Sequence, residues 1–134
     1  MSVSVLQVMA GAQTGGAEAF FVRLVSALAR AGTPQHAAIR HHDGRRKTLI
    51  DAGVPVTELA FSGKFDMITK GSVKRLAKSF NPDVVLVWMN RAAKIAPKGD
   101  WTVVGRLGGY YKLKNYKRCD HLVANTHDIR DYLI

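Results

Sequence analysis

Runs of apolar residues of strand length alternate along this chain with segments whose apolar residues recur every three or four positions. The run DVVLVW, at 83–88, is unbroken and apolar after Asp83, which is typical of a strand buried on both faces of a parallel sheet. Five further strands are predicted at 3–9, 35–40, 55–61, 101–106 and 121–124, and helices at 17–28, 45–52, 66–80 and 126–134. Because parallel neighbours need right-handed crossovers, this alternation predicts an α/β fold: a Rossmann-like, doubly wound parallel sheet with helices on both faces.

Helix-breaking and capping residues set the expected ends of the helices. These residues are Gly32 with Pro34, Gly53, Asn81 with Pro82, and Asn125 or Thr126 as the cap of the last helix. The segment 41–44, HHDG, is expected to be a loop.

The carboxyl ends of two strands are expected to form the ligand site. In an open parallel sheet, ligands bind beyond these ends at the point where the strand order reverses, here between the first and fourth strands. Those ends are GAQTGG at 11–16 and WMNRAA at 88–93, and the fifth strand adds RLGGYYKLK at 106–114 to the same edge. Asn90 and Arg91 should face the crevice, whereas Trp88 is expected in the core.

The glycine-rich segment after the first strand has the opening spacing of a phosphate-binding P-loop. The lysine and hydroxyl that should follow are replaced by Ala17 and Glu18, which argues against a P-loop ATPase or GTPase. Gly15 and Gly16 open a helix whose free N–H groups favour an anion, and neither has a Cβ to keep a diphosphate away. The alternative is a tight strand-to-helix turn with no ligand.

The segment after the fifth strand mixes cationic, small and aromatic side chains. Aromatic faces stack on sugars or bases and cations meet phosphates, although tyrosines can equally pack at the edge of the core. The residues concerned are Arg106, Gly108, Gly109, Tyr110, Tyr111 and Lys112.

The charge of the chain limits its partners. The formal net charge is +10, and residues 91–118 hold eight basic residues against the single acid Asp100. Such an excess favours nucleic acid, anionic lipid or phosphorylated small molecules, or is a solvated surface without a ligand. No run approaches the roughly 18 apolar residues of a membrane span. Cys119 is the only cysteine, which excludes an intrachain disulfide, and His41, His42 and Asp43 have no further ligand at fixed spacing, so no metal site is predicted.

Several segments together resemble the N-terminal domain of GT-B glycosyltransferases of family 4. They are GGAEAFFVRLVSALARAG, AGVPVTEL, FNPDVVLVW and GRLGGYYKLKNYKRCDHLVANT, in this order over essentially the whole chain. The resemblance implies two Rossmann-like domains that face each other across a cleft. The C-terminal domain would hold a nucleotide sugar, and the N-terminal one, here residues 1–134, the acceptor.

The resemblance also implies roles for individual residues. Gly15 and Gly16 would lie beside the donor diphosphate, and transfer would proceed with retention at the anomeric carbon, without a metal or other cofactor. The residues expected on the acceptor side of the cleft are Thr14, Glu18, Asn90, Arg91, Gly108, Gly109, Tyr111 and Lys112. Many members carry a histidine after the fifth strand, where this chain has RLGGY, so Arg106 and Tyr110 are the catalytic candidates.

The expected function is therefore the acceptor-binding half of a retaining hexosyltransferase that makes cell-surface polysaccharide, lipopolysaccharide or glycolipid. The acceptor would be a glycan, lipid-linked or phosphorylated, and the enzyme would be cytoplasmic, in peripheral contact with the anionic inner face of the membrane. The chain is expected to be a piece of a longer protein, inactive without its C-terminal domain.

Two other functions stay open at this stage. An NADP-dependent reductase would use Arg40 for a 2′-phosphate and Tyr110 with Lys114 as a dyad, but G-x-G-x-x-G is missing. A nucleic-acid binder is motivated by charge alone and lacks any recognition motif.

Overall fold

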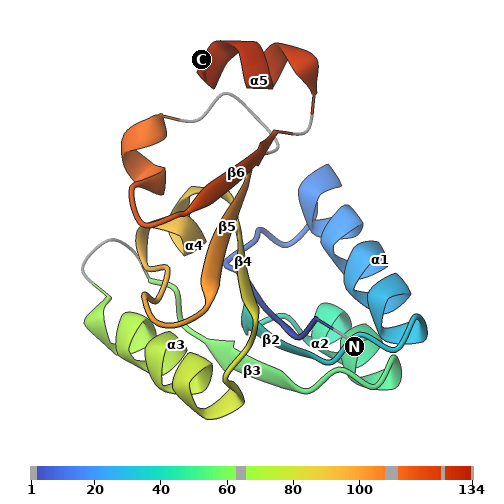
Figure 1. Ribbon diagram of the computed structural model, residues 1–134. Coiled ribbons are helices and arrows are strands. Elements are labelled where there is room, and N and C mark those ends of the chain that lie inside the picture. Colours follow the sequence, from blue (N-terminus) through green and yellow to red (C-terminus); the bar gives the residue numbers. More distant parts are fainter. Residues whose placement is uncertain (1–2, 63–65, 108–111, 125, 134) are drawn as a thin grey trace.

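Six strands of the described residues form one parallel sheet in the order β3-β2-β1-β4-β5-β6 (Figure 1). The computed structural model describes residues 3–62, 66–107, 112–124 and 126–133. The strands are β1 (Val5–Met9), β2 (Gln35–Arg40), β3 (Val56–Leu59), β4 (Val84–Trp88), β5 (Thr102–Leu107) and β6 (His121–Ala124). The predicted doubly wound sheet is confirmed.

The strand order reverses beside β1, which lies between β2 and β4. Met9 at its end is in register with Ile39 of β2 and with Trp88 of β4. The carboxyl ends of the three strands therefore meet at one edge, where the sequence places the site.

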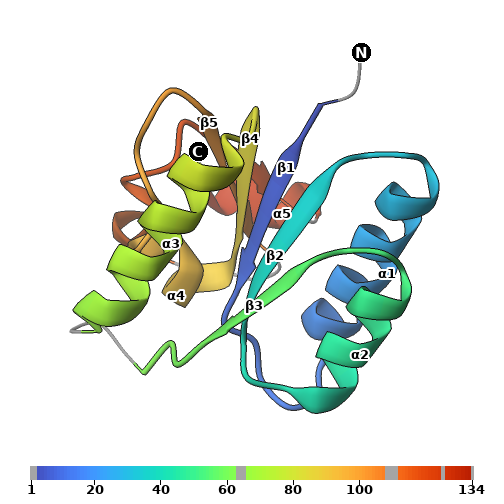
Figure 2. The ribbon, with the colours of Figure 1, turned by 90° about the horizontal axis from the view of Figure 1, so that it is seen from below.

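Helices cover both faces of the sheet, as Figure 2 shows: α1 and α2 lie on one face, α3 and α4 on the other. The helices are α1 (Gly16–Arg30), α2 (Asp43–Asp51), α3 (Met67–Phe80), α4 (Met89–Lys94), α5 (His127–Leu133) and the 3₁₀ helix η1 (Leu113–Tyr116). Leu6 and Val8 belong to the core cluster that includes Val73 of α3, whereas Met9 belongs to the cluster with Phe21 of α1. Two separate apolar cores thus sandwich the sheet. In the described part of the chain, no helix combines the length and apolar character that crossing a bilayer requires.

The predicted helix ends are confirmed where they rest on backbone chemistry. Gly32 and Gly53 follow α1 and α2 with φ of 88°, a left-handed conformation that suits glycine, and Asn81 ends α3 with φ of 51°. Asp66 caps α3 by accepting from the N–H of Thr69 at 2.9 Å. Hydrogen bonds donated by Thr69, and then by Ser62, hold the pKa of Asp66 well below its usual range.

Some predicted boundaries were wrong. The first strand begins at Val5 because Ser4 instead bonds the carboxylate of Asp83 through both its N–H and its hydroxyl. The third strand is likewise shorter than predicted. The segment HHDG is only partly a loop, since α2 begins at Asp43 and His42 caps it, a role that Ser, Thr, Asp or Asn more often fills.

Two short helices lie in segments to which the sequence analysis assigns no helix. Helix α4 comes directly after β4 and buries Ala92 and Ala93, and η1 buries Tyr116. Six and four residues are too short for a helical period to be read from sequence.

Candidate functional site

A cavity of about 330 Å³ lies at the edge where β1 and β4 end. It is lined by Ala10, Gly11, Ala12, Glu18, Arg40, Trp88, Met89, Asn90 and Arg91. The structure therefore brings together the two strand ends that the sequence singles out, and places Glu18, Asn90 and Arg91 in one cavity. Its volume is at the lower end of the roughly 300–1,000 Å³ typical of small-molecule sites.

A chain of buried hydrogen bonds fixes the floor of this cavity. Trp88 Nε1 donates to Gln7 Oε1 at 2.9 Å, Gln7 Nε2 donates to Gln35 Oε1 at 3.0 Å, and Gln35 Nε2 donates to the carbonyl of Val25 at 2.9 Å. Phe21 packs edge-on against Trp88 with ring centroids 5.1 Å apart. Trp88 is fully buried, which confirms its predicted place in the core.

The glycine loop is shaped by the carboxylate of Glu18, which turns back toward it. Glu18 Oε2 accepts from the N–H of Ala12 at 2.7 Å. A Cβ on Gly15 would collide with Glu18 Oε1, whereas a Cβ on Gly16 would meet nothing within 4 Å. The backbone φ of 156° at Gly15 also favours glycine there, while Gly16 faces open space at the start of a helix whose N-cap residue makes no side-chain hydrogen bond.

A second cavity, of about 410 Å³, lies between the starts of α1 and α2. Thr14 and Gly15 line this cavity and not the first one, whereas Glu18 lines both. The predicted cleft residues therefore divide between two adjacent cavities that share Glu18.

Arg45 of α2 is a site residue that sequence reasoning missed. It is buried, and its Nη2 donates to the carbonyl of Ala12 at 2.8 Å. Burial lowers the pKa of Arg45 below the usual value, and the nearby charge of Glu18 offsets part of that shift. His42 holds the next residue of the loop: its Nδ1 accepts from the N–H of Arg45 at 2.9 Å, and its Nε2 donates to the carbonyl of Gln13 at 2.9 Å. In sequence, Arg45 stands in a polar run that resembles solvated surface.

Arg40 ends β2, as expected, and reaches into the first cavity. Its Nη2 donates to the carbonyl of Phe61 at 2.9 Å and its Nη1 makes a longer contact, of 3.4 Å, with the carbonyl of Gly11. Arg91 Nη1 donates to the same Phe61 carbonyl at 3.0 Å. One carbonyl oxygen thus accepts from two guanidinium groups.

Arg106, a predicted catalytic candidate, is buried at the end of β5. Its guanidinium carbon lies 4.7 Å from the ring centroid of Phe20 and 4.6 Å from that of Trp88, a cation–π arrangement on the α1 side of the sheet. Arg106 lines neither of the two cavities above. Lys112 is exposed just before η1. The other candidates of this segment, Gly108, Gly109, Tyr110 and Tyr111, lie outside the described residues.

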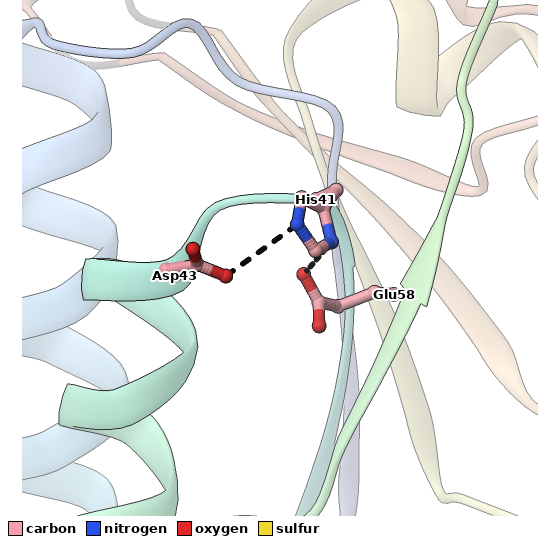
Figure 3. A group of neighbouring side chains, drawn as sticks. All are labelled: His41, Asp43 and Glu58. Carbon is pink, nitrogen blue, oxygen red and sulfur yellow. Dashed lines mark ion pairs between the residues drawn. The ribbon is translucent and has the colours of Figure 1, made fainter.

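His41, Asp43 and Glu58 form a cluster with the composition of a metal site, shown in Figure 3. His41 Nδ1 lies 2.6 Å from Glu58 Oε2, and His41 Nε2 lies 3.4 Å from Asp43 Oδ1. The sequence did not reveal Glu58 because it comes from β3. Arg46 Nε, 3.2 Å from Glu58 Oε1, already supplies positive charge. These ion pairs link the turn after β2 to β3. The absence of a metal site stays a prediction.

No family model matches the chain. Two curated proteins of Rhizobium meliloti (strain 1021) are similar to it. The "Lipopolysaccharide core biosynthesis glycosyltransferase LpsE" is 38% identical over 122 residues, which cover 87% of this chain and 35% of that protein. LpsD, of the same description, is 35% identical over 119 residues, which cover 86% of this chain and 34% of that protein. The chain thus spans about a third of the length of these relatives.

Solved structures share the fold. A glycosyltransferase from Rickettsia africae ESF-5 matches with a TM-score of 0.78 at 17% identity, over 98% of this chain and 39% of that one. Anabaena Alr3699/HepE in complex with UDP matches with a TM-score of 0.73 at 12% identity, over 96% of this chain and 39% of that one. The chain has the fold of one Rossmann-like domain of GT-B glycosyltransferases.

Proposed function

We propose that this chain is the N-terminal, acceptor-binding half of a GT-B glycosyltransferase of family 4 that acts in lipopolysaccharide core synthesis. The observation that carries the proposal is the similarity of most of the chain to two curated lipopolysaccharide core glycosyltransferases. The cavity where β1 and β4 end supplies a space of ligand size at the position where such folds bind ligands. The acceptor is a glycan, lipid-linked or phosphorylated.

The donor is a nucleotide-diphosphate sugar held mainly by a C-terminal domain. The curated relatives have room for a domain of this kind, because this chain spans about a third of their length. The donor diphosphate would lie near Gly15 and Gly16, at the uncapped positive end of α1. HepE, which shares the fold, was solved with UDP, and this supports a nucleotide donor.

Transfer would proceed with retention at the anomeric carbon and without a metal, as the family resemblance implies. Positive charge and the dipole of α1 would stabilise the departing diphosphate. For Arg106, burial against Phe20 and Trp88 favours a positioning role, in which its guanidinium keeps the Trp88 ring in place at the floor of the cavity. Tyr110 stays the other catalytic candidate.

We place the enzyme in the cytoplasm, at the inner face of the membrane. The basic segment 91–118 supports this location, because its lysines are exposed and can meet anionic lipid. They are Lys94, Lys98, Lys112, Lys114 and Lys117.

The test uses the full-length protein with radiolabelled nucleotide sugars and core oligosaccharide from cells that lack its gene. We expect label in the oligosaccharide, a shortened core in the deletion strain, and restoration by the wild-type gene. Asn90→Ala should lower transfer, whereas Arg30→Gln, at the far end of α1, should not. The 134-residue chain alone should be inactive. An unchanged core in the deletion strain, together with no transfer from any nucleotide sugar, would refute the proposal.

A further inference from the structure

Two arginines on different elements converge on one oxygen at the first cavity. Arg40 at the end of β2 and Arg91 in α4 both donate to the carbonyl of Phe61, at 2.9 Å and 3.0 Å, and both line the cavity. Phe61 has φ of 48°, a conformation uncommon for a large side chain. The backbone at Phe61 therefore holds two like charges together beside an open space.

No carboxylate pairs with these two charges in the described part of the chain. The ion pairs there involve neither Arg40 nor Arg91. Glu18 is the only acid among the described lining residues, and its carboxylate bonds the N–H of Ala12 and interacts with Arg45. Because a guanidinium carries five N–H donors, both arginines keep donors beyond those that bond the backbone carbonyls of Gly11 and Phe61. The cavity is thus a cationic site with donors to spare.

The same cavity offers a group for a neutral, hydroxyl-bearing ligand. Asn90 Oδ1 is buried and accepts no hydrogen bond from the described residues. A buried acceptor without a donor is costly, and a ligand hydroxyl would supply the donor once the Asn90 side chain turns its Oδ1, now covered, toward the cavity that this residue lines. Positive charge and an amide together suit a sugar that carries an anionic group.

We propose that this cavity binds the phosphate monoester of a phosphorylated sugar, with Arg40 and Arg91 as its ligands and Asn90 on a sugar hydroxyl. A phosphate monoester carries a charge of about −1.5 to −2 at pH 7, which matches two guanidiniums better than a single carboxylate does. Arginine also suits phosphate because its planar fork donates two parallel hydrogen bonds. That this sugar phosphate is the acceptor rests on the proposed function.

Calorimetric titration of the full-length protein, with no nucleotide sugar present, tests the binding without any transfer step. The probes are glucose 6-phosphate, glucose, glucuronate and UDP. Glucose 6-phosphate should bind at least about tenfold more tightly than glucose or glucuronate, and its affinity should fall as salt rises. Arg91→Gln should weaken it about tenfold or more, since a hydrogen-bonded charge is lost. Arg30→Gln is the control: it also removes one guanidinium charge, but at the C-terminal end of α1, away from the cavity, and should leave binding unchanged.

Thermal unfolding of each variant separates lost binding from lost structure. Arg91 is exposed, so Arg91→Gln should unfold at the wild-type temperature, whereas the half-buried Arg40 can contribute to stability. The proposal is overturned if glucose 6-phosphate does not bind at tens of millimolar, or binds the folded Arg91→Gln variant equally well. Glucuronate binding as tightly would assign a carboxylate site instead. UDP binding that depends on Arg91 would assign a donor site.

A lipid headgroup is the remaining source of phosphate. Cosedimentation with phosphatidylcholine vesicles that contain phosphatidylglycerol should not depend on Arg91, and dependence on Arg91 would overturn the sugar assignment.

The outcomes also separate the phosphate site from the proposed function. Transfer by the full-length protein with an unchanged acceptor KM in Arg91→Gln would leave the function standing and refute the phosphate site. Arg91-dependent binding of glucose 6-phosphate without any transfer would support the phosphate site and refute the proposed function.

Discussion

Replacing Gln7 by methionine tests whether the buried amide chain stabilises the floor of the cavity. The two side chains are similar in volume, but methionine ends both hydrogen bonds of Gln7. Trp88 Nε1–H and Gln35 Oε1 then stay buried without those partners, and each unpaired group destabilises the fold by about 1–3 kcal/mol. Because the amide of Gln7 itself no longer has to be buried, we expect a net loss of about 2–4 kcal/mol in the free energy of unfolding.

Urea denaturation followed by circular dichroism measures this loss. With a slope of about 2 kcal/mol/M, the midpoint should fall by about 1–2 M at an unchanged slope. Gln13→Met makes the same exchange in an exposed loop and should change stability by no more than about 0.5 kcal/mol. A Gln7→Met loss as small as that of Gln13→Met would refute the reasoning.

A double variant adds a sharper check on the chain of bonds. Gln35→Met alone leaves Gln7 Nε2 without its acceptor and removes the side-chain bond to the carbonyl of Val25. In the double variant, Gln7 and Gln35 no longer contribute polar groups, so its cost should be clearly less than the sum of the two single losses. Simple additivity would show that the amides act independently.

Three further predictions follow from close contacts and burial. Gly15→Ala should lower the midpoint of thermal unfolding, because the backbone of residue 15 is unfavourable for alanine and the added Cβ would meet Glu18. Gly16→Ala should leave this midpoint unchanged, and equal midpoints for the two variants would contradict the reasoning. Gly105→Ala should also lower the midpoint, since its Cβ would lie 2.8 Å from Cys119 Sγ, and an unchanged midpoint would show that the neighbours give way. Burial raises the pKa of the Cys119 thiol to about 11, so alkylation of this thiol at pH 8 should be far slower in the native than in the unfolded chain. For the same reason, the free energy of unfolding should fall as pH rises from about 8.5 toward 11. Equal alkylation rates in the two states would contradict the raised pKa.

The sheet could be predicted because its signal is local. Strand β4 is apolar on both faces, and the alternation with helical segments leaves few topologies, so the meeting of β1 and β4 follows from general rules. Helix ends at Gly32 and Asn81 were equally readable, since each depends on a backbone conformation that few residues adopt.

The chemistry of the site was less predictable because it depends on contacts between distant segments. Arg45 and Glu58 lie in polar stretches, and nothing local shows that one is buried beneath the glycine loop and the other joins His41. Arg40 was noted at a strand end, but its convergence with Arg91 requires the Phe61 carbonyl, contributed by a third segment.

The central place of β1 has a consequence for how the chain is made. Of the six strands in this sheet, β1 leaves the ribosome first, yet its residue Val5 pairs with Val84 of β4, far along the chain. Until Trp88 has been synthesised, one edge of β1 and its apolar face stay open to other chains, and closing so long a segment costs entropy before the new contacts form. A nascent chain stalled ahead of Trp88 would therefore expose a core strand and be a target for chaperones or proteases.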